Sequence, residues 1–313
     1  MNASHSLSYA YDSLYGAYLK SHYPLEYYTV ALNLYDGDAE RTSKLTNELD
    51  YFNIKLKEPK FRYANASYSM DKETNTIYKG IKSIKFLNET VANELYSLRD
   101  NEYVDFLDLL VDIDKLQINS RQLEILVRLD FFSEFGKRKY LLDIVNIYNK
   151  WFKKKTFKKS NLPLSETKMR EISEKETTSQ FSKVDNKTLC KILINTLDED
   201  EELDISEIIS NECEYYGNPT TINENEDPRL CIALEINTKY TPIIKFYNIC
   251  SGRTCNVKIS KKLWKNNLIE KYNVVYLNNT FQKNKMKKEN NQWITLEEYD
   301  VWCDDYKIRR DYE

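Results

Sequence analysis

Residues 118–139 have the sequence INSRQLEILVRLDFFSEFGKRK, which predicts two helices joined by a tight turn. Ser120 is a residue type that caps helix N-termini, so the first helix is expected to run from Ser120 to Leu129. Gly136 marks the turn, and the second helix is expected over residues 137–151. Because short helices joined by tight turns are typical of helical hairpins, the stretch predicts such a hairpin.

The chain before this hairpin is expected to be mainly helical, because aromatic and apolar residues recur there at helical spacing. Short alternating stretches between the helices predict a few strands and one β-hairpin. Helices are expected over 5–34 with a break at Pro24, then over 39–53, 81–86, 89–98 and 103–112, and strands over 54–56, 68–70 and 76–78.

The composition changes after the hairpin. Residues 153–186 are rich in Lys, Glu, Ser and Thr, which indicates a polar linker that is disordered in part. Helices are expected over 187–196 and 205–215, on either side of an acidic block. From Gly217 the sequence is β-rich, and strands over 229–237, 242–250, 255–260, 273–277 and 280–285 predict a small five-stranded barrel of the OB type.

The formal net charge is only −3, so no global basic field indicates a nucleic-acid partner. The charge is nevertheless segregated, because an acidic block, Asp198–Asp204, separates two basic stretches. Two basic faces and ordinary solvated surface are both compatible with this pattern. The basic residues are Lys137, Arg138, Lys139, Lys150, Lys153, Lys154, Lys155, Lys158 and Lys159, then Arg253, Lys258, Lys261, Lys262, Lys265, Lys271, Lys283, Lys285, Lys287 and Lys288.

No stretch approaches the roughly 20 apolar residues that a membrane span needs. The first ten residues are polar and lack the order of a signal peptide. We therefore expect a cytoplasmic protein with no membrane partner, whose six cysteines are reduced thiols. Cys250 and Cys255 have a spacing that zinc ligands use, but no second pair follows at such a spacing, so no metal site is assigned.

Several motifs, taken in order, resemble the C-terminal part of the alpha subunit of bacterial replicative DNA polymerase III, a C-family DNA polymerase. Asn2-Ala3-Ser4-His5, Tyr9, Tyr15, Ala17-Tyr18-Leu19-Lys20 and Tyr23-Pro24 are similar to the family's fingers helix, with Ala3 where the family has lysine. Lys79–Glu89 and Ile118–Arg138 resemble its two helix-hairpin-helix motifs. Glu212–Gly217 resembles the element before its OB domain.

The resemblance implies an α+β fold: an N-terminal all-helical region with tandem helix-hairpin-helix motifs, a helical linker and a C-terminal small OB-like β-barrel. The expected domains are 1–70, the end of a fingers-like region; 71–152, the tandem hairpins; 153–216, the polar helical linker; and 217–313, the barrel.

Helical hairpins bind phosphate through backbone N–H groups at the turn and the next helix N-terminus, and glycines let the backbone approach closely. In the first hairpin Phe86 and Asn88 replace the family's turn glycines, and phenylalanine does not readily adopt a positive φ. The second hairpin keeps Gly136 and is the better candidate. The DNA-binding residues implied are Lys85, Asn88, Gly136, Lys137, Arg138 and Lys139, and the nucleotide-proximal residues of the fingers-like helix are Ser4, His5 and Tyr9.

A polymerase needs paired carboxylates that hold two metal ions roughly 3.5–4 Å apart. Asp112-Ile113-Asp114 is the one similar motif, and it lies on an expected solvated helix face. In the family the catalytic aspartates belong to a palm that would precede residue 1. We therefore expect no catalytic residue and no cofactor in this chain, with Mg²⁺ only in the palm.

The expected partner is DNA, as primer-template duplex at the hairpins and single-stranded template at the barrel, and a palm-bearing polymerase subunit and a sliding clamp are further candidate partners. Barrels of this type stack bases on aromatics above a basic groove. Three functions stay open: a DNA-binding polymerase portion, half of a split polymerase with a palm-bearing partner, or a decayed remnant that serves as a protein-interaction module. Gln122–Leu126 and Gln180-Phe181 only partly match a sliding-clamp peptide, so no clamp site is assigned. The barrel candidates are Tyr240, Lys245, Phe246, Tyr247, Arg253 and Lys258.

Overall fold

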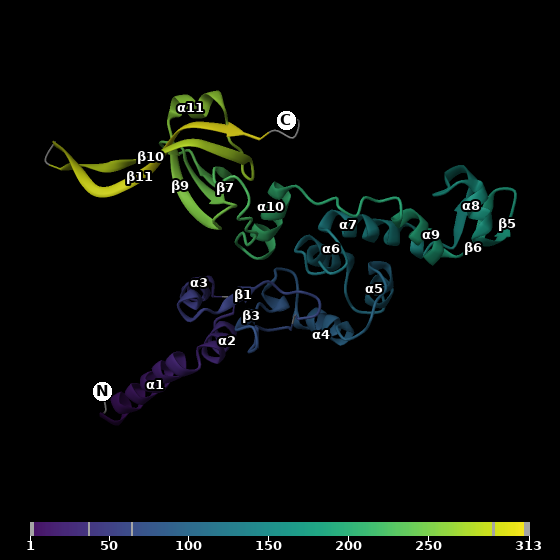
Figure 1. The fold of residues 1–313 in the computed structure, drawn as a ribbon, viewed down its shortest axis with the longest axis horizontal. Helices are drawn as coiled ribbons and strands as arrows, with labels where there is room; N and C mark the ends of the chain where they lie inside the picture. The colour runs from purple at the N-terminus through teal and green to yellow at the C-terminus, as the bar shows by residue number, and fades with distance from the viewer. Residues whose placement is uncertain (1–2, 37, 64, 290–291, 310–313) are drawn as a thin grey trace. The chain divides into compact units, whose positions relative to one another are not determined.

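The computed structural model describes residues 3–36, 38–63, 65–289 and 292–309 (Figure 1). Internal contacts divide the chain into two compact units, Met1–Glu202 and Leu203–Glu313. The acidic block expected from the sequence spans the boundary between the units. Each unit has its own buried apolar residues, so each has a core of its own.

The first unit begins with a largely exposed helix, Ala3–His22, and the next helix, Pro24–Leu34, packs on a small three-stranded sheet. The helical run is interrupted before Pro24, as expected. The β-hairpin expected at 68–78 is present, and its second strand also pairs in parallel with an earlier strand. Leu25, Tyr28, Leu32, Leu49 and Ile77 form the core between helices and sheet. The elements are α1 (Ala3–His22), α2 (Pro24–Leu34), α3 (Ala39–Glu48), η1 (Leu49–Phe52), β1 (Lys55–Lys57), β2 (Ser69–Asp71) and β3 (Thr76–Tyr78).

Two helical hairpins follow, and side-chain caps fix where most of their helices begin. The α6 cap is Asn119, which forms a reciprocal capping box with Gln122, so the expectation of Ser120 as cap was wrong by one residue. The expected helix over 81–86 is a short 3₁₀ turn. The elements are η2 (Ile81–Ser83), α4 (Glu89–Leu98), α5 (Phe106–Ile113), α6 (Ser120–Arg128), α7 (Arg138–Ile147) and the π-helical η3 (Tyr148–Phe152).

An aromatic cluster joins the second hairpin to the segment before the first. The Phe61 ring lies 5.7 Å from the Phe132 ring and 6.2 Å from the Phe135 ring, and the Phe61 N–H donates to the Phe131 carbonyl at 3.0 Å. Phe106 completes the cluster, 5.3 Å from Phe132. Because Phe61, Phe106, Phe131 and Phe132 are almost fully buried, the turn of the second hairpin rests on a rigid base.

The segment expected to be a polar linker contains a folded subdomain in its first half. An antiparallel sheet in the order β4-β6-β5 forms there, and Phe157, Met169 and Phe181 are fully buried beneath it. These three isolated apolar residues are spread through polar sequence, which hid the core. The elements are β4 (Thr156–Lys158), η4 (Lys159–Asn161), α8 (Glu166–Glu171), β5 (Ser173–Glu176), β6 (Gln180–Val184) and α9 (Asn186–Ile194).

The second unit is a closed five-stranded barrel in the order β10-β11-β9-β8-β7, in which β9 and β11 run parallel. The OB-like barrel expected from the sequence is therefore present. Helix α10, expected within the linker, packs with the barrel through Ile209, which clusters with Leu230 and Ile232. The elements are α10 (Ile205–Tyr215), β7 (Leu230–Asn237), β8 (Ile243–Asn248), β9 (Arg253–Ile259), α11 (Lys261–Asn266), β10 (Val274–Glu289) and β11 (Gln292–Ile308).

The last two strands differ from the expectation. The two strands expected over 273–277 and 280–285 form parts of one long strand, β10, with register shifts at Asn279. The fifth strand is β11, which was not predicted. Only Val274–Tyr276 of β10 pairs with β7, and only Val301–Cys303 of β11 pairs with β9. Beyond these pairings the two strands continue as a two-stranded ribbon (Figure 1).

Candidate nucleic-acid interface

The turn of the second hairpin has a backbone that only glycine adopts readily. Gly136 has a φ of +144°, and a Cβ atom added there would lie 2.8 Å from Cδ1 of Tyr140. The Tyr140 ring, in the first turn of α7, thus packs directly on the turn. The glycine expected to let the backbone approach a ligand is required by this local geometry as well.

The N-terminus of α7 differs from those of the other hairpin helices. Asn88, Asp105 and Asn119 cap α4, α5 and α6 with side-chain oxygens, whereas the α7 cap residue, Lys137, forms no side-chain cap hydrogen bond. A helix N-terminus without such a cap leaves backbone N–H groups and the positive end of the helix dipole available to an anion. Among the four helices, α7 is the one prepared for an external acceptor.

Two of the three cations expected at this turn are already paired. Arg138 Nη1 lies 3.0 Å from Glu202 Oε2, with the two side chains 14% and 29% exposed, and Lys139 Nζ lies 2.5 Å from Asp143 Oδ2. Within the described part of the chain, Lys137 has no ion-pair partner. The structure therefore places all three beside Gly136 and leaves Lys137 as the one of the three without an ion pair among the described residues.

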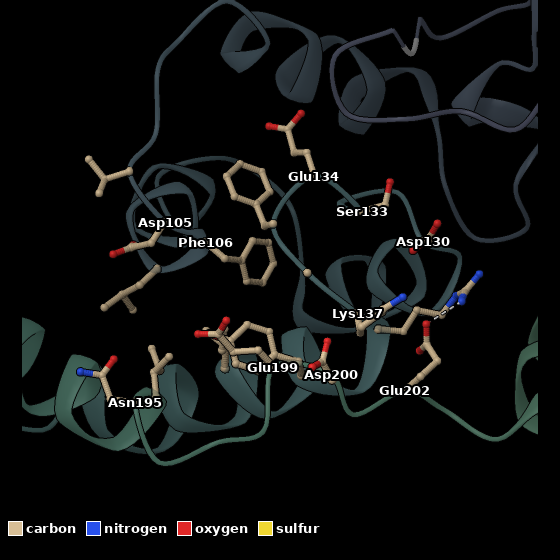
Figure 2. A pocket seen from close by; sticks show the side chains of 18 of the residues that line it. Asp105, Phe106, Asp130, Ser133, Glu134, Lys137, Asn195, Glu199, Asp200 and Glu202 are labelled. Carbon is tan, nitrogen blue, oxygen red and sulfur yellow. Dashed lines mark hydrogen bonds and ion pairs between the residues drawn. The ribbon is translucent and has the colours of Figure 1, made fainter.

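A hollow of about 770 Å³ lies at this turn, between the start of α5, the turn itself and the chain after α9. Figure 2 shows Glu199, Asp200 and Glu202 along one side of the hollow, facing the turn that carries Ser133, Glu134 and Lys137. Burial, together with the charges of Glu199 and Asp105, raises the pKa of Tyr140. Acidic side chains thus lie close to the Tyr140 ring, although the turn that borders the hollow carries cations.

The first hairpin turn adopts the conformation that its sequence disfavours. Phe86 has a φ of +73°, the residue is 44% exposed, and two cations lie close to its ring. The Arg121 guanidinium carbon lies 4.0 Å and Lys85 Nζ 4.9 Å from the ring centroid, and Gln122 Nε2 donates to the Phe86 carbonyl at 3.2 Å. Asn88 has an extended backbone with a φ of −141°, and its side-chain oxygen caps α4 by accepting from the N–H of Val91. Arg121, which sequence reasoning missed, thus tethers this turn to the second hairpin.

We expect Phe86→Gly to be more stable than Phe86→Ala by about 1 kcal/mol, the reverse of their order within a helix. Both substitutions remove the ring contacts with Arg121 and Lys85, but only glycine relieves the left-handed backbone. Urea denaturation of the two variants measures the difference. An alanine variant as stable as the glycine variant would contradict the strain at this position.

Of the three fingers-like residues, only Tyr9 has a side chain within the described structure. Ser4 and His5 belong to the first turns of α1, and their side chains lie outside the described residues. Tyr9 is 62% exposed on the same helix. Their implied role near a nucleotide remains a prediction.

The carboxylates that resemble metal ligands bind cations of the protein. Asp112 Oδ1 lies 2.7 Å from Lys115 Nζ and Asp112 Oδ2 accepts from the Tyr103 hydroxyl, while Asp114 pairs with Lys153 at 2.5 Å. Among residues 3–36, 38–63, 65–289 and 292–309, no three His, Cys, Asp or Glu side chains are grouped to hold a metal ion.

The barrel candidates separate into core and surface. Phe246 and Tyr247 are 1% and 2% exposed, so they belong to the core and offer no stacking surface. Tyr240 is 75% exposed, and Lys239 lies over its ring at 5.6 Å. A residue that was missed, Trp302, lies with its ring between 5.5 and 5.9 Å from the ammonium groups of Lys283 and Lys258.

The other barrel cations are distributed in the same way. Lys245 pairs with Glu235 at 2.8 Å and Lys258 with Asp300 at 2.6 Å, while Arg253 is exposed at the start of β9. The peptides that partly resemble clamp ligands are built into the fold, because Leu126 of α6 and Phe181 of β6 are fully buried. No described helix is both long and apolar enough to span a membrane.

Two helical hairpins lie on this aromatic base, and residues 53–141 match the family described as helix-hairpin-helix motif. The relatives are more specific: the chain is similar to the DNA polymerase III subunit alpha of several bacteria. It is 30% identical to that of Campylobacter jejuni over 221 residues, 69% of this chain, and 31% identical to that of Ureaplasma parvum over 147 residues, 46% of this chain. The Bacillus subtilis protein is 24% identical over 142 residues, 45% of this chain.

These matches confirm the resemblance expected from the motifs. They cover 17% of the Campylobacter protein, 15% of the Ureaplasma protein and 13% of the Bacillus protein. The chain therefore spans less than a fifth of the length of these relatives, and its own residues 53–141 carry the helix-hairpin-helix match.

Proposed function

We propose that this chain is a DNA-binding portion of a DNA polymerase III alpha subunit and that it grips the phosphate backbone through the second hairpin. The observation that carries the proposal is the N-terminus of α7, which has no side-chain cap and lies beside Gly136 and Lys137. It falls within the region that matches the helix-hairpin-helix family. A positive helix end, a close backbone approach and a lysine without a partner together suit a phosphate.

In its finer form, the proposal assigns the duplex part of a primer-template to the hairpins and the template strand to the barrel. Exposed Tyr240 and the lysine-flanked Trp302 are the barrel residues best suited to stack on bases. Catalysis would need Mg²⁺ on a palm-bearing partner, since no three His, Cys, Asp or Glu side chains are grouped to hold a metal ion among the described residues. Such a role would place the chain in the cytoplasm with the replicating DNA.

We expect the full chain to bind a fluorescein-labelled DNA duplex with an affinity that falls by about tenfold or more between roughly 50 and 200 mM salt, because phosphate contacts release counterions. Lys137→Ala should weaken binding roughly fivefold at low salt and flatten the slope of log affinity against log salt by about 1. Fluorescence anisotropy measures both quantities.

The matched control is Lys168→Ala, which removes an exposed lysine on α8, away from the hairpins. It should leave both the affinity and the salt slope within about twofold of the parent chain. Binding that ignores salt, or an equal loss in both variants, would rule out specific phosphate binding by the second hairpin and would favour a protein-interaction module.

A further inference from the structure

The acidic segment Asp198–Glu202, five consecutive carboxylates, lies against the turn that the proposed function assigns to phosphate. From sequence the segment was expected to be solvated linker surface. Instead Glu199, Asp200 and Glu202 line the same hollow as Gly136, Lys137 and Arg138 (Figure 2). All of these residues belong to the first unit, so the contact lies inside one packed body.

The contact with Arg138 is only partly satisfied. Its Nη1 bonds a single oxygen of Glu202, while its Nε is buried and has no hydrogen-bond partner in the described structure. A guanidinium presents its N–H groups as a fork that fits two oxygens of one carboxylate or phosphate. This hydrogen bond to Glu202 thus uses one nitrogen of the guanidinium, and a phosphate with several oxygens could accept from more of its N–H groups.

The balance of charge at the hollow opposes DNA. Three cations line it, Lys137, Arg138 and Lys191, and two of these are already paired, with Glu202 and Asp105. Like charges within a Debye length of each other repel, and a phosphate would enter against this field. Six carboxylates line the hollow, and four of them lie in ion pairs: Asp105 with Lys191, Asp130 with Lys60, Glu134 with Arg62 and Glu202 with Arg138. The excess of negative charge at the hollow therefore comes from Glu199 and Asp200.

We propose that the acidic segment occupies the phosphate-binding turn of the second hairpin and competes with DNA for it, with Glu202 holding Arg138 in place of a phosphate. The inference rests on the proposed function and adds regulation of the same site. DNA binds only by displacing the segment from Arg138, so apparent affinity is reduced by the fraction of molecules in which the segment is docked. Any agent that neutralises or withdraws the segment strengthens DNA binding.

The test compares two triple variants that change net charge equally. Glu199→Gln/Asp200→Asn/Glu202→Gln should bind the labelled duplex roughly tenfold more tightly than the parent at about 50 mM salt. The control Glu73→Gln/Glu171→Gln/Glu174→Gln neutralises three exposed carboxylates elsewhere in the first unit and should gain less than about threefold. Equal gains would reduce the effect to overall charge and overturn the inference.

A double-mutant cycle separates the specific contact from the general field. Glu202→Gln alone keeps the shape of the side chain and should gain roughly threefold, and in an Arg138→Gln background this gain should shrink to less than about twofold. An undiminished gain would show that Glu202 does not act through Arg138. If the parent chain binds DNA and no acidic variant gains, only the inference fails; if no variant binds DNA at all, the proposed function fails with it.

Discussion

Replacing Phe132 by alanine is expected to lower the free energy of unfolding of the Met1–Glu202 unit by about 3–5 kcal/mol. The Phe132 side chain is fully buried, with ring centroids of Phe61, Phe106 and Phe131 at 5.7, 5.3 and 4.9 Å. Truncation removes its dispersion contacts and leaves a cavity beneath the hairpin turn, which rigid neighbouring rings cannot fill.

Urea denaturation followed by near-ultraviolet circular dichroism measures this loss. Because the two units have separate cores, the unfolding transition of Leu203–Glu313 should keep its midpoint in the variant. The matched control is Phe281→Ala, since Phe281 is 42% exposed on β10 and its loss should cost less than about 1 kcal/mol. A shift of both transitions by the same amount would contradict independent cores.

Replacing Glu212 by alanine is expected to lower the free energy of unfolding of the second unit by about 3 kcal/mol. Glu212 is only 4% exposed, and it accepts hydrogen bonds from the N–H of Thr220 at 2.7 Å, the N–H of Thr221 at 3.0 Å and the Thr221 hydroxyl. The Thr221 carbonyl in turn accepts from the buried Tyr247 hydroxyl at 2.8 Å. The carboxylate thus joins α10 to the chain that enters the barrel, and alanine would leave three donors without an acceptor.

The control for this prediction is the exposed neighbour, Glu214→Ala, which should change stability by less than about 0.5 kcal/mol. Glu212→Gln, which keeps one acceptor oxygen, should fall between the two. Thermal unfolding monitored by tryptophan fluorescence gives the order of stability of the three variants. Alanine at 212 and at 214 with equal midpoints would mean that the bonds to Thr220 and Thr221 contribute no net stability.

The sequence predicted best those elements whose local signals agree with their environment. Helix α10 was expected over 205–215 and runs from Ile205 to Tyr215, because an acidic cap precedes it and a glycine follows it. The β7–β9 meander was expected within a few residues at each end, since its strands alternate around clear turns. In both cases one face of the element is buried, so pattern and packing select the same structure.

Other elements could not be predicted because their structure depends on distant partners. Strand β11 carries Glu297, Glu298 and Asp300, which disfavour a strand, yet Asp300 pairs with Lys258 and Glu298 with Lys285 on neighbouring strands. The position of Phe86 likewise depends on Arg121, 35 residues away in the chain.

The sequence predicted which residues group at the candidate site, but it did not predict the residues that pair with them in the fold. Gly136, Lys137, Arg138 and Lys139 are adjacent in sequence, so their grouping followed from the turn alone. The partner of Arg138 is Glu202, and no local pattern connects the two. An acidic run that follows a basic helix start in the same unit is a signal that charge complementarity could have used.

The ribbon formed by β10 and β11 beyond the barrel has a consequence for how the second unit exchanges its amide hydrogens. Outside the barrel, β10 and β11 pair only with each other, so a second edge of each strand has no neighbouring strand. Their backbone hydrogen bonds are covered only by exposed side chains such as Met286 and Ile294. Such a ladder opens from its tip at a free energy well below that of global unfolding. The ribbon amides should therefore exchange through local fraying, whereas the amides of β7 and β8 should exchange only when the barrel itself unfolds.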